Sequence, residues 1–168
     1  AYLQQCLGVQ RGDRVLLMSQ NCPQFVIAYF AVLRAGAAVV PVNPMSTIPE
    51  IRYYLADSGA RVAFVAQDLL AQVLPCTAAN QPDGLDGVVV HAYSDGLPGQ
   101  SADEVPDWVR LARQPLPGAA CHGFEDALAL HLQPGDNMGT PADLAVLPYT
   151  SGTTGHPKGC VHTHATVL

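Results

Sequence analysis

Hydroxyl groups, glycines and a lysine are concentrated near the end of the chain. Four hydroxyl side chains, three glycines and one lysine occur within ten residues: Thr150, Ser151, Gly152, Thr153, Thr154, Gly155, Lys158 and Gly159. Glycines allow positive φ angles and a close approach of the main chain, so successive N–H groups can converge on anionic oxygens. The hydroxyls add short donors, and Lys158 adds a full positive charge. This combination is typical of a loop that binds phosphate.

Two other interpretations fit this segment less well. A surface turn rich in Ser, Thr and Gly has a similar composition, but here the apolar run 144–147 precedes the loop and Pro157 stiffens the approach to Lys158. A Walker A loop requires G-x-x-x-x-G-K-[ST] leading into a helix. In this chain a proline precedes the lysine, a glycine follows it, and residues 161–163 favour a strand. The pattern therefore departs from a Walker A loop at three points.

The elements that must position this loop are short apolar runs that alternate with helical patterns. We expect strands over 14–19, 38–42, 61–66, 87–93 and 143–149, and helices over 1–7, 23–35, 48–57 and 107–113. Alternating strands and helices predict βαβ units and a parallel sheet. Consecutive apolar residues, as in the run 15–18, are typical of strands that are covered on both faces. The sequence therefore predicts an α/β fold with helices on both faces of a parallel sheet.

Capping residues mark the ends of the two longer helices. We expect Asn21 to cap the helix over 23–35 and Gly36 to end it. The interior of this helix is apolar nearly all round, which predicts that it is buried. Thr47 and Glu50 have the T-x-x-E spacing of a capping box for the next helix.

A segment rich in Gly, Pro and Asp extends over 94–123. Such composition predicts a surface excursion rather than a domain boundary. Trp108 lies within it, and a single Trp on a short amphipathic helix usually packs locally.

Composition and charge exclude several classes of function. The 168 residues, 49% of them hydrophobic, can support one domain core. The formal net charge of -6 repels polyphosphate backbones, so we expect no nucleic-acid partner. The five cysteines are odd in number and lack a C-x-x-C pair, which favours reduced thiols in a cytoplasmic protein.

The longest apolar stretch, 25–42, approaches the length of a membrane span. Arg34 lies inside it, and Gly36 and Pro41 interrupt it, so we expect no span. We expect the protein in the cytoplasm, in solution or at the periphery of a membrane. Because the chain opens without an initiator Met or a signal-peptide pattern, we also expect residue 1 to lie inside a longer sequence.

Two histidines and a cysteine after the loop could be read as functional groups. His162 and His164 alternate along one expected strand face, but no third ligand is evident, and we expect no metal there. Cys160 has no base nearby in the sequence and is expected to be a small packing residue.

Residues 149–159, Y-T-S-G-T-T-G-H-P-K-G, resemble the Y-T-S-G-T-T-G-x-P-K-G signature of the adenylate-forming superfamily. This superfamily includes acyl-CoA synthetases, aryl-CoA ligases, luciferases and peptide-synthetase adenylation domains. His156 occupies the variable position. A second resemblance, to the opening of the same family, runs through 8–15, 21–25, 35–36 and 41–44. The resemblance implies that residues 1–168 are an incomplete N-terminal subdomain of the family's large domain, with a phosphate-binding loop over 149–159.

The reaction implied by this resemblance has two steps. A carboxylate attacks the α-phosphate of ATP to give an acyl adenylate, and the thiol of coenzyme A then displaces AMP. Carried over by position, residues 150–155 and Gly159 would contact the β- and γ-phosphates. Lys158 would be the catalytic residue, since it offsets charge that develops toward pyrophosphate. Magnesium would bridge the phosphates, with Thr150 the hydroxyl nearest to it.

The resemblance is greatest to fatty-acyl-CoA synthetases, which implies a fatty acid as the substrate. Two alternatives stay open: an aryl-CoA ligase or adenylation domain, and a non-catalytic nucleotide-binding or assembly module. The family's later elements, including the glutamate that holds magnesium and the lysine of its C-terminal domain, do not occur within residues 1–168. We therefore expect this chain alone to be inactive, and to form homo-oligomers through apolar surface that further sequence would cover.

Overall fold

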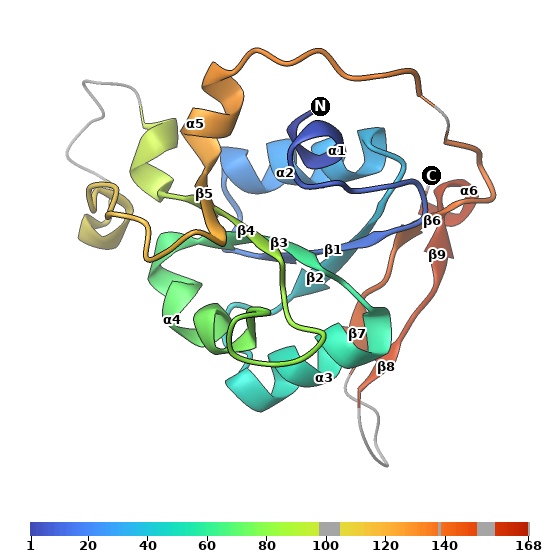
Figure 1. Cartoon of the computed structure of the whole chain (residues 1–168), viewed down its shortest axis with the longest axis horizontal. Coiled ribbons are helices and arrows are strands. Elements are labelled where there is room, and N and C mark those ends of the chain that lie inside the picture. Colours follow the sequence, from blue (N-terminus) through green and yellow to red (C-terminus); the bar gives the residue numbers. More distant parts are fainter. Residues whose placement is uncertain (98–104, 138, 151–156, 168) are drawn as a thin grey trace.

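The computed structural model describes residues 1–97, 105–137, 139–150 and 157–167. A sheet lies at its centre with helices on both faces (Figure 1). The strands are β1 (Arg14–Met18), β2 (Ala38–Val42), β3 (Val62–Ala66), β4 (Gly87–His91), β5 (Cys121–Gly123), β6 (Leu144–Val146), β7 (Tyr149–Thr150), β8 (Lys158–Gly159) and β9 (His162–Thr163). The α-helices are α1 (Tyr2–Gln5), α2 (Pro23–Arg34), α3 (Ile48–Ser58), α4 (Leu70–Val73), α5 (Phe124–Ala129) and α6 (His164–Val167). The predicted α/β fold is confirmed.

Within the described ranges, seven strands form one sheet in the order β5-β4-β3-β1-β2-β6-β9. All neighbours in this sheet are parallel except β6 and β9, which are antiparallel. Because β2 follows β1 on one side and β3 lies on the other, the chain reverses direction across the sheet at β1. In open α/β sheets, ligands bind beyond the carboxyl ends of the strands near such a reversal.

The strands β1 to β4 and the helices α2 and α3 confirm the expected elements, with ends shifted by no more than two residues. The expected strand over 143–149 is instead divided into β6 and β7. Pro148 lies at the break and has no N–H to donate to a ladder. The first helix is shorter than expected and ends at Gln5, because Gly8 turns the chain with φ 67°.

Of the three short strands β5, β8 and β9, only β9 was expected, because residues 161–163 favour a strand. Each has only two or three residues. Runs of this length carry no recognisable apolar period, so tertiary pairing decides that they form strands. The expectation of five strands was therefore too low.

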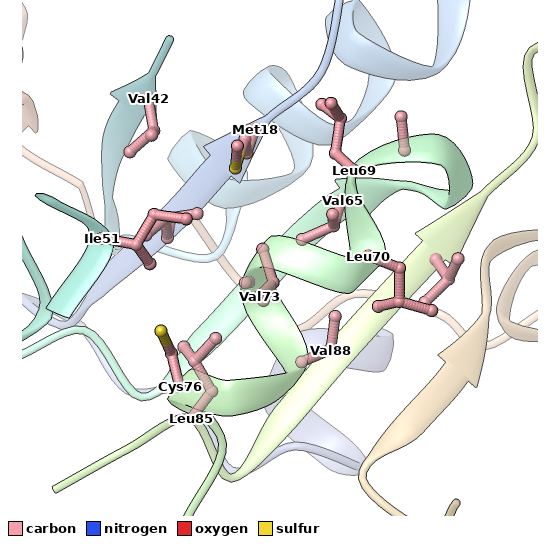
Figure 2. Packing of buried hydrophobic residues seen from close by; sticks show 14 of the residues in the cluster. Met18, Val42, Ile51, Val65, Leu69, Leu70, Val73, Cys76, Leu85 and Val88 are labelled. Carbon is pink, nitrogen blue, oxygen red and sulfur yellow. The ribbon is translucent and has the colours of Figure 1, made fainter. Parts of the chain in front are cut away.

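Two apolar clusters cover the two faces of the sheet. One contains side chains of β1 to β4 with α3 and α4, including Ile51, Leu55 and Val73, all at most 2% exposed (Figure 2). The other contains the opposite faces of the same strands with α1, α2 and the residue Phe124. Because each strand buries both sets of side chains, the consecutive apolar runs of the sequence are explained.

The structure corrects two expectations for α2. Its N-cap is Cys22 rather than Asn21, and the Cys22 sulfur accepts a 3.4 Å hydrogen bond from the backbone N–H of Phe25. The helix is not buried all round. Ala28 and Val32, one turn apart, pack against the sheet, while an apolar set on the other side is exposed: Val26 by 52%, Ile27 by 46% and Phe30 by 62%. A single sheet can cover only one side of a helix.

None of the helices in the described ranges is long and apolar enough to cross a membrane.

The capping residues of α3 are confirmed. The Glu50 carboxylate accepts hydrogen bonds from the Thr47 N–H at 2.7 Å and from the Thr47 hydroxyl at 2.8 Å. These bonds lower the pKa of Glu50. Gly59 ends the helix with φ 68°, a conformation that favours glycine. Helix α3 therefore begins and ends at fixed points against the sheet.

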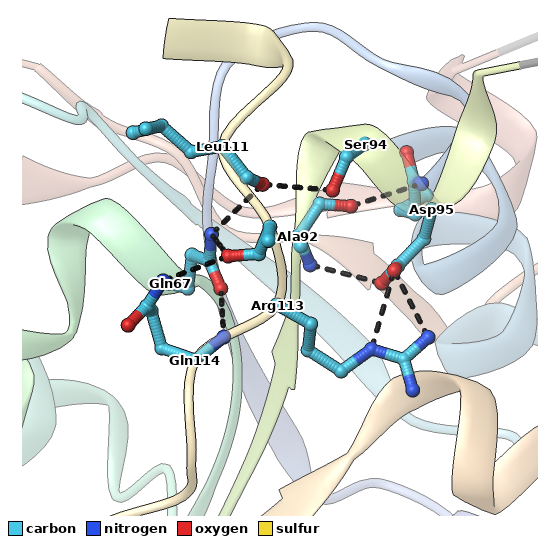
Figure 3. A network of polar contacts seen from close by, with 9 residues as sticks. Gln67, Ala92, Ser94, Asp95, Leu111, Arg113 and Gln114 are labelled. Carbon is cyan, nitrogen blue, oxygen red and sulfur yellow. Dashed lines mark hydrogen bonds and ion pairs between the residues drawn. The ribbon is translucent and has the colours of Figure 1, made fainter.

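The expected excursion over 94–123 is held by contacts within itself and with residues that follow β3 and β4. Arg113 pairs with Asp95 at 2.9 Å, and Gln67 donates to the Ala112 carbonyl at 3.1 Å (Figure 3). The ring of Trp108 packs edge-on against Tyr93 at 5.0 Å, which confirms the expected local packing. The expected helix over 107–113 is only a 3-10 turn, Asp107–Val109. The segment also contains a strand, because its last three residues are β5.

Candidate phosphate-binding site

The two ends of the predicted phosphate loop form an antiparallel hairpin after β6. Tyr149 pairs with Gly159, and Thr150 pairs with Lys158. The backbone N–H of Cys160 donates to the Pro148 carbonyl at 2.8 Å, which extends the pairing toward β6. We call residues 149–150 and 157–160 the loop stem. Five predicted binding residues lie outside the described residues: Ser151, Gly152, Thr153, Thr154 and Gly155.

Thr150 and Lys158 lie on the same face of the loop stem. Residues directly opposite each other in an antiparallel pair project to one side, so the side chains of Thr150 and Lys158 leave the stem side by side. Both residues are exposed. Lys158 is also the only lysine in the chain. Within the described residues no carboxylate pairs with it, so its charge is available to an anion.

Gly159 lies on the opposite face of the stem, where packing leaves little room for a side chain. A β carbon at this position would lie 3.1 Å from Cδ1 of Leu147 and 3.4 Å from Cζ of Tyr149. Its φ is not in the left-handed region. Gly159 therefore allows the close packing of the stem against Leu147 and Tyr149.

Helix α3 holds the loop stem through residues that sequence reasoning missed. The Tyr149 hydroxyl donates a 2.6 Å hydrogen bond to Oδ2 of Asp57. The Tyr53 hydroxyl donates a 2.8 Å hydrogen bond to the carbonyl of Pro157. These pairs are 92 and 104 residues apart in sequence, which is why no local motif indicates them. The available signal was a Tyr and an Asp four residues apart on α3.

A buried polar pair lies at the carboxyl ends of β1 and β4. Nε2 of His91 is 3.0 Å from Oγ of Ser19, and both residues are at most 5% exposed. Nδ1 of His91 is buried and has no hydrogen-bond partner among the described residues. Burial lowers the pKa of His91 to about 4. The imidazole is therefore neutral near pH 7. The signal for this pair was a polar residue at the end of each apolar run, Ser19 after β1 and His91 as the last residue of β4.

The two histidines after the loop do not share a strand face as expected. His162 belongs to β9, whereas His164 is the first residue of α6. Within residues 1–97, 105–137, 139–150 and 157–167, no group of three or more His, Cys, Asp or Glu side chains is placed to hold a metal ion. Cys160 is a free thiol, as are the other four cysteines. Its sulfur lies 3.8 Å from Oγ1 of Thr150.

Comparison with known proteins gives a match over the whole chain. The profile of the family described as AMP-binding enzyme matches residues 1–168. The chain is 36% identical to a long-chain-fatty-acid–CoA ligase of Escherichia coli over 179 aligned residues, which cover 100% of this chain and 30% of that protein. It is 34% identical to a long-chain-fatty-acid–CoA ligase of Bacillus subtilis, over 98% of this chain and 30% of that protein. The chain thus spans less than a third of the length of these relatives.

A solved structure shows a similar arrangement of the chain. The anthranilate CoA ligase AuaEII, in complex with anthranoyl-AMP, superposes with a TM-score of 0.60 and is 30% identical. The match covers 94% of this chain and 26% of that protein.

Proposed function

The chain belongs to the AMP-binding enzyme family, and we propose that the protein containing it uses ATP to activate a carboxylic acid and transfers the acyl group to coenzyme A. In the first step a carboxylate oxygen attacks the α-phosphorus of ATP, and the bond to the β-phosphate oxygen breaks to release pyrophosphate. In the second step the sulfur of coenzyme A attacks the acyl carbon, and AMP leaves. The thiol proton is lost as the thioester forms.

The observation that carries this proposal is the loop stem. An exposed ammonium group and a hydroxyl project from one face of a hairpin that follows the parallel strand β6. The net charge of -6 offers no general attraction for a triphosphate, so the attraction must be local. Lys158 supplies that charge, and we assign it the role of offsetting the negative charge that develops on pyrophosphate.

Among the described residues, Thr150 offers one oxygen ligand to a magnesium–nucleotide complex. Mg²⁺ prefers six oxygen ligands and is usually held by one or two protein oxygens together with substrate phosphates and water. Thr150 would supply one hydroxyl oxygen, and Gly159 and the loop residues 151–155 would supply contacts to the phosphates. The metal, when bound, neutralises phosphate charge.

A fatty acid is the substrate that we propose. The supporting observation is that the bacterial relatives at 34 to 36% identity are long-chain-fatty-acid–CoA ligases. An aromatic acid is the second candidate, because the solved anthranilate CoA ligase is 30% identical over nearly the whole chain. Both assignments concern the longer protein, of which this chain supplies one part.

We further propose that the exposed side of α2 makes this chain self-associate when it is expressed alone. Val26, Ile27 and Phe30 are exposed on α2, and a groove of about 750 Å³ lies between Phe30 and Val167 of α6. Apolar surface of this kind is usually covered by protein. Light scattering of the chain and of a Phe30→Asp variant tests the point: we expect oligomers that the substitution dissociates, and a monomer in both would contradict it.

A pyrophosphate-release assay tests the function. The longer protein is incubated with ATP, Mg²⁺ and either a long-chain fatty acid or an aromatic acid, with and without coenzyme A. We expect pyrophosphate with the fatty acid and a thioester only when coenzyme A is present. A response to the aromatic acid alone would favour the second candidate. If neither acid leads to pyrophosphate release although ATP binds tightly, the result would favour a non-catalytic nucleotide-binding module.

A further inference from the structure

Helix α3 lies beside the β7–β8 hairpin (Figure 1) and contacts both ends of the predicted phosphate loop. Tyr53 and Asp57 are four residues apart on the helix, so they project from the same side. Asp57 binds the first strand of the loop stem and Tyr53 binds the residue before the second. One rigid helix therefore contacts the chain where it enters and where it leaves the loop.

The contact at the entrance combines a hydrogen bond with ring packing. Besides its 2.6 Å bond to Asp57, the Tyr149 ring lies 4.6 Å from the ring of Tyr54 between centroids. Burial, together with the hydrogen bond to the Asp57 carboxylate, holds the pKa of Tyr149 well above its usual range. The phenol therefore keeps its proton near neutral pH and can donate to Asp57.

The contact at the exit acts on the peptide unit of Lys158. The carbonyl of Pro157 and the N–H of Lys158 belong to one planar peptide group. The Tyr53 hydroxyl, 2.8 Å from that carbonyl, therefore restrains the plane from which the Lys158 side chain departs. The Tyr53 ring also packs edge-on against Tyr149 at 6.3 Å, so the two contacts support each other.

We propose that Asp57 and Tyr53 are positioning residues: by holding Tyr149 and Pro157 they set the direction in which Thr150 and Lys158 face the nucleotide. This inference rests on the proposed function, because it assigns a purpose to the stem of the same loop. The alternation of side chains along the stem places Tyr149 toward α3 and Thr150 away from it. The helix itself is fixed to the sheet by Ile51 and Leu55, both at most 2% exposed.

The test uses the longer protein with Asp57→Ala, Asp57→Asn, Tyr53→Phe and Tyr54→Phe variants. Tyr54→Phe is the matched control, because the Tyr54 hydroxyl makes no hydrogen bond in the part of the chain that the structure describes. We expect Asp57→Ala and Tyr53→Phe each to lower kcat for pyrophosphate release about tenfold, since a small misplacement of a reacting group is costly. The KM for the acid and the melting temperature should stay unchanged. Asp57→Asn, which keeps an acceptor for Tyr149, should retain most of the activity.

Deuterium exchange supplies a readout that does not depend on activity. We expect the backbone N–H groups over 158–160 to exchange about fivefold faster in Asp57→Ala and Tyr53→Phe than in the parent protein, the scale of one lost hydrogen bond. Tyr54→Phe should not change them. Unchanged exchange together with unchanged kcat, or equal losses in the Tyr54→Phe control, would overturn the proposal.

The two hypotheses fail in different ways. If the parent protein releases no pyrophosphate with any acid, the proposed function fails, and the exchange data still decide whether α3 holds the loop stem. If the parent is active and the Asp57→Ala and Tyr53→Phe variants match it, only the positioning role fails.

Discussion

Gly159 packs directly against Tyr149: a β carbon at residue 159 would lie 3.4 Å from Cζ of the tyrosine ring. The same carbon would lie 3.1 Å from Cδ1 of Leu147. Gly159 therefore has a packing role in the loop stem that does not depend on a ligand. The stem is closed on one side by aromatic and aliphatic side chains, and its polar side faces the solvent, where we propose that the nucleotide binds.

Replacing Gly159 by alanine should therefore destabilise the fold. Because Leu147 and Tyr149 would have to move by a few tenths of an ångström, we expect a loss of about 1 kcal/mol in the free energy of unfolding, at the low end for an overpacked site. Gly135→Ala is the control, since a β carbon there meets nothing within 4 Å. Urea unfolding of both variants measures the difference. Equal stabilities would mean that the stem accommodates the methyl group.

Lys158→Ala should slow pyrophosphate release in the longer protein by roughly 10²-fold, the usual scale for one lost electrostatic group. The side chain is exposed, so the melting temperature should not change. Lys158→Arg keeps the charge and should recover part of the rate. An unchanged rate in the alanine variant would remove Lys158 from the mechanism.

Glu50→Ala should destabilise α3 more than Thr47→Ala does. The Glu50 carboxylate accepts two hydrogen bonds from Thr47, one from its backbone and one from its hydroxyl. Removing the hydroxyl leaves the backbone bond in place, whereas removing the carboxylate breaks both. We expect losses between about 0.5 and 2 kcal/mol, with the larger value for Glu50→Ala. Thermal unfolding followed by circular dichroism gives the order, and the reverse order would contradict this assignment of the cap.

Stability should fall as the pH drops through the titration range of His91. The pKa of His91 is about 4 in the folded chain and near 6.5 when unfolded. Between these two pH values the unfolded state binds a proton that the folded state does not bind. The loss begins near pH 6.5 and is complete near pH 4, where it reaches roughly 3 kcal/mol.

A His91→Gln variant isolates this contribution, because glutamine does not titrate but can still bond to Ser19. The difference in unfolding free energy between parent and variant should shrink by that amount between pH 7 and pH 4. A difference that does not depend on pH would show that the pKa of His91 is the same in the folded and unfolded states.

Much of the sheet could be predicted from sequence because its central strands carry their own signal. The run Val15-Leu16-Leu17-Met18 is apolar at every position, which is typical of a strand covered on both faces. The capping box of α3 is equally local, since Thr47 and Glu50 are three residues apart. Such features need no knowledge of the rest of the fold.

The exposed side of α2 could not be predicted, because an apolar residue such as Phe30 does not reveal whether anything covers it. The cap at Cys22 was missed because sulfur is a weak acceptor and Asn21 is the stronger candidate by type. The strands β5 and β8 exist only through pairing with β4 and β7.

Some residues of the candidate site could be predicted from a local motif, and others could not. The composition around Lys158 indicates a phosphate loop from sequence alone, whereas the contribution of α3 depends on pairs such as Asp57 and Tyr149, 92 residues apart. Only the topology brings them together.

The most direct test of the phosphate-binding role is the chemical reactivity of Lys158 in the longer protein. Its rate of acetylation by an amine-selective reagent is measured by peptide mass spectrometry in the presence of Mg²⁺, with no nucleotide, with saturating ATP or with saturating AMP. Because the ammonium group is proposed to contact the β- and γ-phosphates, we expect ATP to slow acetylation about tenfold or more and AMP to have little effect, as a charge-assisted contact of this strength implies. Equal reactivity with and without ATP would contradict the assignment of this loop as the triphosphate site.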